Sequence, residues 1–453
     1  MIINESIIKD GITSELLNKL ISKHISSIDK YSKLRSYYKG QHDILNRRRS
    51  SGDAANNKVV CNYAKYITDM STSYLIGVPV SYAPSEGYDI EALKNAYFEQ
   101  DISSVDAELV KQCSIYGHTY ELVYADENSK PRSTQINPEQ AFVVYNDNCK
   151  GEPLFGVYYY KTYDIDGNVS GVVCNVYTDS EILVYRSKTD SWRNMQMEEK
   201  SRHYFGDVPL IEYRNNSEMQ GDFEQLIPLI DAYNVLQSDR VNDKEQFVDA
   251  FLFLTGIDID SEQAKKLREE RILMGYEGAA AQYLSKVMTE SDIQVLSDNI
   301  KSDIHKFSCV PDLSDESFGN NLSGVAIKYK LMGFEQQVRN KERYIARSLK
   351  ERFKLYTNYL SLKGAMEWIP VHRVDIVFTR NLPVNNLEVA QMINNLNGMV
   401  TQETLLGQLD FVGDPKEEAE LAKKEQADKQ RQAMDAMDYR DYGKPIKTNE
   451  NKE

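Results

Sequence analysis

The sequence contains few residues of the kinds that build disulfide scaffolds or zinc sites. Its 453 residues include only five cysteines, which lie far apart and form no CxxC pair. An odd number of cysteines without such a pair fits neither a disulfide framework nor a structural zinc site. We therefore expect the chain to work in a reducing compartment and to hold no metal.

Long apolar segments are also absent. The longest apolar stretch runs from Ala250 to Leu254, far short of the ~18 residues that a membrane-spanning helix needs. The first charged residue, Glu5, comes too early for a signal peptide. We expect a soluble protein that is made in the cytoplasm and has no membrane partner.

An excess of basic residues is missing as well. The 54 Lys and Arg residues are outnumbered by 69 Asp and Glu residues, which gives a net charge of −15. Diffuse electrostatic attraction to nucleic acid or to anionic lipid is therefore excluded as the main mode of action. If DNA is a partner, it must be handled without adhesion.

The familiar catalytic motifs do not occur. The only Gly-Lys pair is Gly443-Lys444, and Asp438 stands where the first glycine of a nucleotide-binding P-loop belongs. HExxH, GxSxG and GxGxxG patterns are absent, and the six histidines lack metal-ligand spacing. Cys113 and His118 could form a reactive thiolate pair, but a buried cysteine in a helix that ends at Gly117 is the favoured interpretation. We expect no enzyme activity and no cofactor.

The apolar patterns that are present predict helices first and then a sheet, hence an α+β fold. Residues 1–124 read as mostly helical, and Gly77-Val78-Pro79 ends one of these helices. From 119 to about 214 the period changes to two, which predicts an antiparallel sheet. Its strands are expected at Tyr120 to Tyr124, Ala141 to Tyr145, Phe155 to Tyr163, Val172 to Tyr177 and Ile182 to Tyr185.

The middle of the chain predicts two unusual helices around a small insert. The first runs from Gln225 to Phe251, and its centre, 237–246, is polar almost all round. A core within one chain would not use such a helix, so we expect it to bridge domains or to lie in a ring of subunits. After an insert that resembles a small α/β lobe, a second helix opens at Thr289 and is stopped by Pro311. Its apolar stripe leaves a polar face with Ser291, Asp298, Ser302 and Asp303.

The last third predicts one very long helix. After an acidic loop, a helix is expected from Gly324 to about Leu362. Residues 324–363 hold ten Lys or Arg and three Glu, a local charge of +7, so the remainder carries −22. One face of this helix could track DNA, or it could be solvated or pair with another subunit; its basic residues are Arg339, Arg343, Arg347, Lys350 and Lys354. The run Val371 to Phe378 is expected to rejoin the earlier sheet, with short helices and a disordered tail after it.

The order of these parts resembles the portal protein of tailed bacteriophages, of the siphovirus type. The resemblance covers roughly residues 30–410 and is carried by several motifs in a fixed order. These are Tyr37-Tyr38-Lys39-Gly40-Gln41-His42-Asp43-Ile44, then Asn57-Lys58 to Asn62-Tyr63, then Tyr74-Leu75-Ile76-Gly77-Val78-Pro79-Val80, then Leu229-Ile230-Asp231-Ala232-Tyr233-Asn234 with Ser238-Asp239 and Asn242-Asp243, and finally Phe318-Gly319-Asn320-Asn321-Leu322-Ser323-Gly324-Val325-Ala326-Ile327-Lys328-Tyr329-Lys330.

The resemblance implies a division of the chain into the parts of a portal ring. The parts would be a wing (1–222), a first stem helix (223–250), a clip (251–287), a second stem helix (288–308), a tunnel loop (309–323), a long wing helix with a returning strand (324–380), a short helical crown (381–425) and a disordered tail (426–453).

The resemblance also implies partners and site residues. A homo-oligomeric ring of about twelve subunits would stand at the capsid vertex of the virion, after assembly in the host cytoplasm. Double-stranded DNA would pass through it during packaging and ejection. Further partners would be the terminase large subunit, a head-completion adaptor, and the major capsid and scaffolding proteins. The tunnel loop residues would be Val310, Asp312, Leu313, Asp315, Glu316, Phe318, Gly319 and Asn320; the channel-facing stem residues Asp298 and Asp303; and the clip residues that bind adaptor or terminase Arg268, Arg271 and Tyr276.

Two other functions remain open at this stage. One is another head-tail ring component, although adaptors are usually much shorter chains. The other is a cytosolic α+β enzyme whose catalytic site carries no known motif. A negative-stain image separates a ring from a globular monomer.

Overall fold

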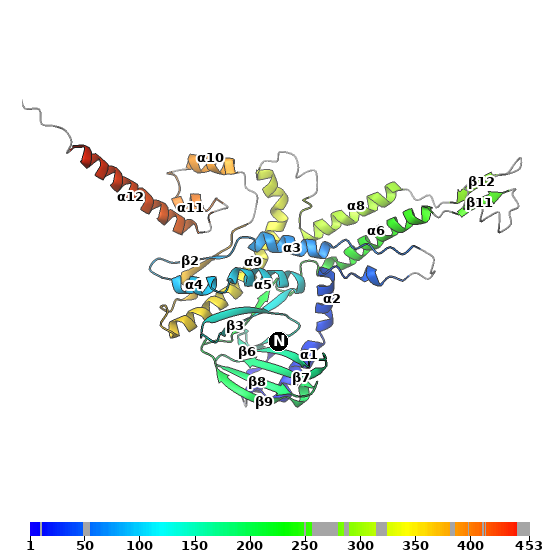
Figure 1. The fold of residues 1–453 in the computed structure, drawn as a ribbon, viewed down its shortest axis with the longest axis horizontal. Coiled ribbons are helices and arrows are strands. Elements are labelled where there is room, and N and C mark those ends of the chain that lie inside the picture. Colours follow the sequence, from blue (N-terminus) through cyan, green and yellow to red (C-terminus); the bar gives the residue numbers. More distant parts are fainter. Residues whose placement is uncertain are drawn as a thin grey trace, which may run out of the picture. The chain divides into compact units, whose positions relative to one another are not determined.

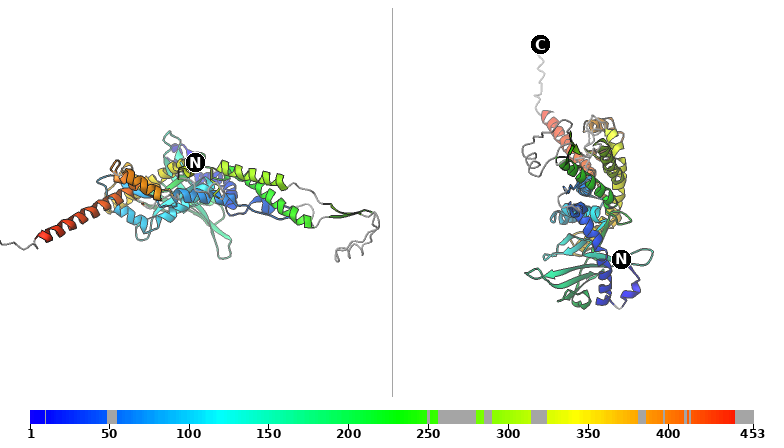
Figure 2. Two further views of the ribbon diagram at one scale, coloured as in Figure 1. Left: turned by 90° about the horizontal axis from the view of Figure 1, so that it is seen from above. Right: turned by 90° about the vertical axis from the view of Figure 1, so that its right-hand side faces the viewer.

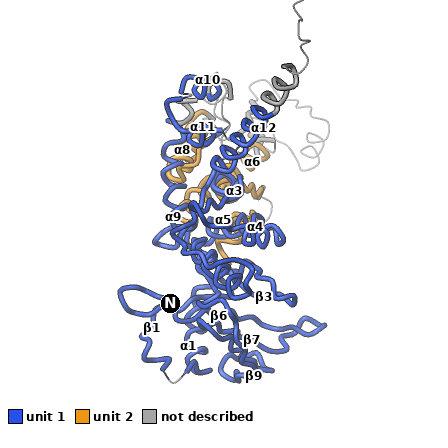
Figure 3. Tube along the Cα trace, turned by 90° about the vertical axis from the view of Figure 1, so that its left-hand side faces the viewer, with its two compact units in different colours: residues 1–28, 69–221, 313–453 blue, residues 29–68, 222–312 orange. Residues whose placement is uncertain are grey.

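The computed structural model describes residues 1–9, 11–48, 55–248, 251–255, 280–284, 290–313, 324–380, 386–396, 398–409, 412 and 414–441. The chain forms two compact units (Figure 3). Unit 1 comprises Met1–Ile28, Asp69–Gly221 and Leu313–Glu453, and unit 2 comprises Asp29–Thr68 and Asp222–Asp312. Of the helices within the described ranges, none is both long enough and apolar enough to cross a membrane.

Unit 1 is built on two sheets and a short strand pair (Figure 1). The six-stranded sheet has the order β1-β5-β6-β7-β8-β9, the three-stranded sheet the order β10-β3-β4, and β13 pairs with β2. All neighbours are antiparallel except β1 and β5. The strands are β1 (Ile2–Ile3), β2 (Ser81–Pro84), β3 (His118–Ala125), β4 (Pro131–Ile136), β5 (Ala141–Asn146), β6 (Pro153–Tyr163), β7 (Val169–Tyr177), β8 (Glu181–Ser187), β9 (Gln196–Arg202), β10 (Leu210–Arg214) and β13 (Val374–Val377).

The core of unit 1 lies where the two sheets meet the first helix (Figures 1 and 2). Alternate residues of β6, namely Phe155, Val157 and Tyr159, point into this core, as the two-residue period of a strand requires. Leu17 and Ile21 of the first helix join the same cluster and are fully buried. The helices of unit 1 are α1 (Ser14–Ile25), α4 (Glu91–Phe98), α5 (Ile102–Tyr116), α9 (Gly324–Leu362), α10 (Asn386–Leu396), α11 (Gln402–Leu406) and α12 (Pro415–Asp441), with short 3-10 turns at Glu5–Ile8, Trp192–Asn194 and Val371–Arg373.

A buried ionic cluster ties α9 to the rest of unit 1. The Arg352 side chain is fully buried, and its Nη1 donates to Asp106 at 2.6 Å and to Glu121 at 3.2 Å. Its Nη2 donates to the hydroxyl of Tyr82 at 3.1 Å, and the Tyr213 hydroxyl donates to Glu121 at 2.6 Å. Burial raises the pKa of Asp106 although the nearby guanidinium opposes this. The single guanidinium of Arg352 thus balances the charges of two buried carboxylates, those of Asp106 and Glu121.

Unit 2 contains a long helical hairpin and the segments that pack on it. Its helices are α2 (Ile28–Tyr38), α6 (Ile227–Val248) and α8 (Glu290–Ser308), with 3-10 turns at Asp43–Asn46 and Glu224–Leu226. Strands β11 (Phe251–Thr255) and β12 (Ala280–Leu284) pair antiparallel, with Phe251 opposite Leu284. Helix α3 (Tyr63–Ile76) begins in unit 2 and ends in unit 1, just before Gly77.

Several predicted elements are confirmed. The long helix has the predicted ends, Gly324 and Leu362, and each of the five predicted strands is present. Asp164–Asn168 forms the hairpin turn between β6 and β7, in which the amide of Asn168 donates to the Asp164 side chain at 2.8 Å. Cys113 is fully buried in α5, and Gly117 ends that helix with a φ of 86°. All five cysteines lie in the described ranges and are reduced.

Other predictions differ from the structure. The sheet region splits into two sheets, and the returning strand pairs with β2 instead of rejoining the larger sheet. The segment 29–68 clusters with α6 and α8 in unit 2, while its assignment to the wing stays a prediction. The tail expected to be disordered from 426 continues as α12 to Asp441. Its Lys, Glu, Gln and Ala residues have high helix propensity, which sustains a helix without an apolar face.

Candidate functional site

An extended segment, residues 57–61, lies along α6 in unit 2, and we call it the strap. The backbone amide of Asn57 donates to the Asn242 side chain at 2.7 Å, and that of Val59 donates to the Ser238 hydroxyl at 2.9 Å. The amide of Cys61 donates to the Asn234 side chain at 2.8 Å. The three acceptor residues are fully buried, and the three donor residues are half-buried, so water has limited access to each bond.

The spacing of these residues explains why the strap and the helix match. The acceptors are four residues apart on α6, which corresponds to about 6.0 Å along a helix. The donors are alternate residues of an extended chain, which corresponds to about 6.6 Å. The two repeats therefore stay in register over three contacts. One polar face of α6 is therefore used inside the chain, and the expectation that this helix bridges domains or lies in a ring of subunits stays a prediction.

A buried histidine extends the same network. His42 is 1% exposed, and its Nε2 lies 2.9 Å from the carbonyl oxygen of Tyr37. Its Nδ1 lies 2.8 Å from the side-chain nitrogen of Asn234. A carbonyl only accepts, so Nε2 carries the proton and Nδ1 accepts from the amide of Asn234. Asn234 therefore uses both ends of its side chain, because its oxygen already accepts from the strap.

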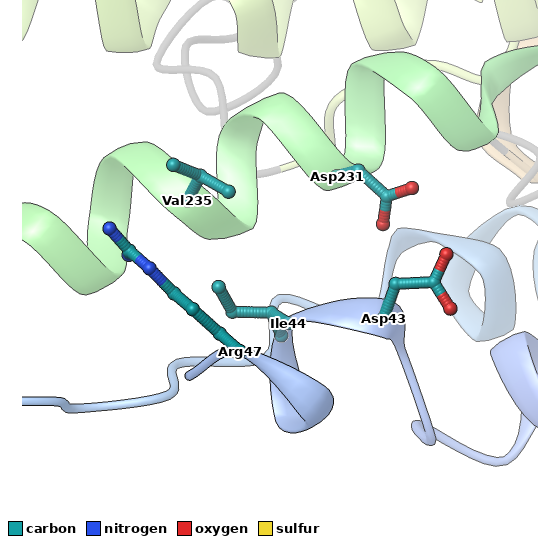
Figure 4. Close-up of a pocket in the computed structure, with 5 residues that line it drawn as sticks. All are labelled: Asp43, Ile44, Arg47, Asp231 and Val235. Carbon is teal, nitrogen blue, oxygen red and sulfur yellow. The ribbon is translucent and has the colours of Figure 1, made fainter. Parts of the chain in front are cut away.

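Charged groups fix the turn beside the strap. The two Nη atoms of Arg47 lie 2.8 and 3.2 Å from the Asp239 carboxylate, and the Tyr37 hydroxyl lies 2.8 Å from Asp231. Burial raises the pKa of Asp231. A shallow depression of about 280 Å³ lies here, lined by Asp43, Ile44, Arg47, Asp231 and Val235. In Figure 4 the two carboxylates lie at one end of it and Arg47 at the other.

Helices α6 and α8 pack side by side through polar and apolar contacts. The Gln237 side chain donates to the Ser297 hydroxyl at 2.8 Å, and Arg240 donates to Gln294 at 3.1 Å. Ile304 is fully buried in this unit. Helix α6 is therefore hydrogen-bonded to the strap on one side and to α8 on another.

The base of the loop after α8 is held in place by three side chains. The Tyr66 hydroxyl donates to the carbonyl of Pro311 at 2.9 Å, and Nδ1 of His305 lies 3.0 Å from the carbonyl of Val310. Lys301 pairs with Asp312 at 2.7 Å, and the bond raises the pKa of Lys301. Nε2 of His305 lies 3.8 Å from the same carboxylate. Val310, Pro311 and Asp312 are thus anchored to α8 and α3.

The turn at the end of α8 uses an uncommon backbone conformation. Cys309 has a φ of 57°, in the left-handed region that costs a residue with a Cβ about 1 kcal/mol or more. The Ser308 hydroxyl supports the turn by accepting from the Val310 amide at 3.2 Å. This reversal directs the chain from α8 into the loop.

The structure places only some of the predicted site residues. Asp312 and Leu313 lie at the anchored loop base, and Leu313 is 51% exposed. Val310 is only 2% exposed, so its side chain packs within the unit, and its assignment to the tunnel loop stays a prediction. The other predicted loop and clip residues lie outside the described ranges: Asp315, Glu316, Phe318, Gly319, Asn320, Arg268, Arg271 and Tyr276.

The two predicted stem carboxylates do not share a direction. Asp298 is exposed and accepts from Gln294 at 2.8 Å, and Asp303 is half-buried. Five residues on an α-helix correspond to a rotation of about 140°, so the two side chains leave α8 on different sides. Ser291 and Ser302 lie on the same side as Asp298 by this rule.

Sequence reasoning missed the strap and the loop anchors. The motifs around His42, Asn57 and Asn234 were noted separately, and no pattern in the sequence joined them. The spacing of Asn234, Ser238 and Asn242 at every fourth residue was the available signal for a buried polar face. In the described part of the chain, no group of three or more His, Cys, Asp or Glu residues is arranged to hold a metal.

Comparisons with known proteins agree on one family. The family model described as "Phage portal protein, SPP1 Gp6-like" matches residues 17–432. The portal protein of Bacillus phage SPP1 is 26% identical over 430 residues, which cover 89% of this chain and 84% of that protein. The portal protein of Clostridium phage phiCD119 is 22% identical over 436 residues, which cover 90% of this chain and 95% of that protein.

Solved structures give weaker matches. A chain from the neck of a native GTA particle, computed with C12 symmetry, matches with a TM-score of 0.41 and 11% identity, covering 76% of this chain and 88% of that chain. A chain from the neck of an empty GTA particle, computed with C6 symmetry, matches with a TM-score of 0.43 and 11% identity, covering 75% of this chain and 86% of that chain. Scores this low establish neither a shared assembly nor a shared symmetry.

Proposed function

Because this chain belongs to the SPP1 Gp6-like family of phage portal proteins, we propose that its copies close into a ring through which double-stranded DNA is packaged and ejected. Portal proteins are structural components, so the chain is not an enzyme and the enzyme alternative is excluded. The proposed ring has about twelve subunits, stands at the capsid vertex of the virion and assembles in the host cytoplasm.

The observation that carries this proposal is the bonded hairpin that ends in an anchored loop. Helices α6 and α8 are held by the strap and by each other, and the chain after α8 is fixed by Tyr66, His305 and Lys301. A channel that passes a stiff polyanion needs such a frame, because a loop in the bore must return to one position after each displacement. We assign α6 and α8 to the stem and 309–323 to the tunnel loop.

The lining of the bore is assigned from the exposed residues. Asp298, with Ser291 and Ser302, forms the polar side of α8 that faces the DNA, and Asp303 lies toward the side of the helix. Asp312 contributes little free charge, since Lys301 is bonded to it at 2.7 Å. The repulsive charge of the loop then falls to Asp315 and Glu316. Leu313, with Phe318 further along the loop, is assigned to the constriction, together with Gly319 and Asn320, and Val310 to packing.

The charge of the chain is consistent with passage without adhesion. A net charge of −15 per chain gives roughly −180 for a ring of about twelve copies, and duplex DNA carries one negative charge per ~1.7 Å. A lining of the same sign as DNA releases no counterions when DNA enters. The energy for translocation comes from a separate motor, because this sequence has no P-loop.

The remaining parts are assigned to partners. The clip (251–287), with Arg268, Arg271 and Tyr276, docks the terminase large subunit during packaging and a head-completion adaptor afterwards. The wing contacts the major capsid and scaffolding proteins, and the short crown from 381 faces the capsid interior.

The experiment that tests this function has two steps. Negative-stain images of the purified chain should contain rings with radial symmetry. In the second step Asp315 and Glu316 are replaced by Lys, which should stall packaging or raise the affinity of the ring for duplex DNA in low salt. Asp312 is kept, because its bond to Lys301 anchors the loop. A chain that never forms rings contradicts the proposal. Unchanged packaging and unchanged DNA affinity contradict the repulsive lining.

A matched control separates the position of the charges from their number. Glu198 and Glu199 are exposed residues of β9, the edge strand of the six-stranded sheet in unit 1. Their replacement by Lys changes the net charge by the same amount away from the loop. This control should leave packaging and DNA affinity as in the unmodified chain.

A further inference from the structure

The outward face of α9 carries an uncompensated group of basic residues. Arg343, Arg347 and Lys350 are exposed, and no carboxylate of the described residues pairs with them. The cations at the two ends of this row are paired, Arg339 with Glu335 at 2.7 Å and Lys354 with Asp207. In a chain with a net charge of −15, three neighbouring cations without a carboxylate are unexpected for a face that is only solvated.

A second uncompensated group lies on and before α4. Glu86, Asp89 and Glu91 are exposed, and among the described residues they too lack a basic partner. Lys94 on the same helix is paired with Glu417 at 3.5 Å. Arg373 packs over the Tyr88 ring in this loop and offsets only part of the negative charge.

An exposed aromatic side chain lies on the same face of α4. Phe98 is 87% exposed, which is unusual for a residue of this size. It follows Glu91 by seven residues, so both lie on one side of the helix. Leu93 and Tyr97 lie on the opposite side and are buried.

The two groups face away from each other within unit 1. The buried faces of α4 and α9 meet where the Tyr97 and Tyr356 rings pack edge to face at 5.0 Å. The outward faces therefore point in opposite directions, and Figure 3 shows α9 along one flank of the unit and α4 along the other. Opposite flanks with opposite charge are what a head-to-tail contact between identical copies requires, and such contacts close into rings.

We propose that the α9 face with Arg343, Arg347 and Lys350 docks on Glu86, Asp89, Glu91 and Phe98 of a neighbouring copy of this chain. This inference rests on the proposed function, which requires a ring, and it names the surfaces that close it. Phe98 supplies the apolar centre and a ring face for a guanidinium, and the charges supply the register. The contact is electrostatic at its edge, so it weakens as salt is raised.

The test is a charge exchange between the two faces. One variant carries R343E, R347E and K350E, a second carries E86K, D89K and E91K, and a third carries all six changes. Ring formation is measured by light scattering after size exclusion and by negative stain at near-physiological salt. Each triple variant should lose most of its rings, with subunit association weakened at least tenfold, and the sixfold variant should recover them. Circular dichroism of each variant checks that the helices remain, and the single change R347E provides a milder form of the same test.

The outcomes separate this interface from the proposed function. Rings that form normally in either triple variant, or rings that the sixfold variant fails to recover, overturn the interface alone. Failure of the unmodified chain to form rings overturns the proposed function and the interface with it. Duplex DNA binding is measured on the same samples. If R343E, R347E and K350E lower DNA binding and leave the rings intact, the α9 face binds DNA and the interface is overturned.

Discussion

Replacing Asn234 by Leu should loosen the strap from α6. Asn234 is fully buried, and it accepts from the Cys61 amide at 2.8 Å and donates to His42 at 2.8 Å. Leucine has a similar shape but no polar atom, so the buried Nδ1 of His42 and the half-buried amide of Cys61 lose their partners. An unpaired buried group costs about 1–3 kcal/mol, and a lost hydrogen bond at a half-buried group costs about 1 kcal/mol. We expect a loss of about 2–4 kcal/mol in the local stability of the strap.

Hydrogen exchange followed by mass spectrometry measures this loss of local stability in the assembled protein. In the unmodified chain the amides of Asn57, Val59 and Cys61 should exchange slowly, because each donates to a buried side chain. Since about 1.4 kcal/mol corresponds to a factor of ten, the Cys61 amide should exchange at least roughly tenfold faster in N234L. Global unfolding in urea gives a second measure of the same loss.

A matched variant controls for the change in hydrophobicity. Asn299 is an exposed residue of α8. Asn299→Leu should leave hydrogen exchange in the strap unchanged and should alter the free energy of unfolding by no more than about 0.5 kcal/mol. If exchange at Cys61 is the same in N234L as in the unmodified chain, the strap is not held by α6 and the reasoning fails.

Further predictions concern unit 1. Arg352→Met should lower the free energy of unfolding by about 3–5 kcal/mol, because Asp106 and Glu121 become buried charges without a cation. The same change at the exposed Arg339 should lower it by less than about 1 kcal/mol. Equal urea midpoints for the two variants would contradict this. Burial lowers the pKa of His24 from 6.5 to about 4, so the unfolded chain binds the proton more readily than the folded chain. The stability from this residue is fully present above about pH 6.5 and is lost as the pH falls toward 4, by about 3 kcal/mol. An unfolding series over this range should be flatter in H24Q, and identical slopes would refute the assignment.

The long, strongly patterned elements of this chain are predictable from sequence. Helix α9 has apolar residues at helical spacing over its whole length, and the serine before it and the glycine near its start mark where it begins. Strands β6 and β7 are rich in Val and Tyr, which favour strands, and they are joined by Asp164–Asn168, whose sequence is typical of a tight turn. These elements are local, so the sequence pattern alone decides them.

Elements that depend on distant partners were missed. Strand β9 is exposed along its full length and carries Glu198, Glu199 and Lys200, so it has no alternating pattern to find. Such charges protect the edge of a sheet from pairing with other chains. The four residues of β2, including Pro84, gave no signal that β13 would pair there. Pairing partners of short strands are set by tertiary packing, which one sequence does not contain.

The candidate site was predictable in its parts but not in its connections. The loop after α8 and its first carboxylate were found, but Lys301 lies eleven residues before Asp312 and gave no sign of the ion pair. The polar centre of α6 predicts a helix that bridges domains or lies in a ring of subunits, and it gives no sign of the strap. A buried polar face is costly unless every group finds a partner, and the partners here are backbone amides of residues 57–61. Backbone groups are present in every sequence, so composition cannot reveal them.

The repeat distances of the strap and of α6 also restrict how this part of the chain can change length. The amides of Asn57, Val59 and Cys61 face the helix because they are alternate residues. Adding or removing one residue within this stretch would turn Asn57 away and present its neighbour instead, so two of the three bonds could not form together. Single-residue insertions and deletions are therefore excluded here, although surface loops generally tolerate them. Related chains should differ in this stretch by substitution at constant length.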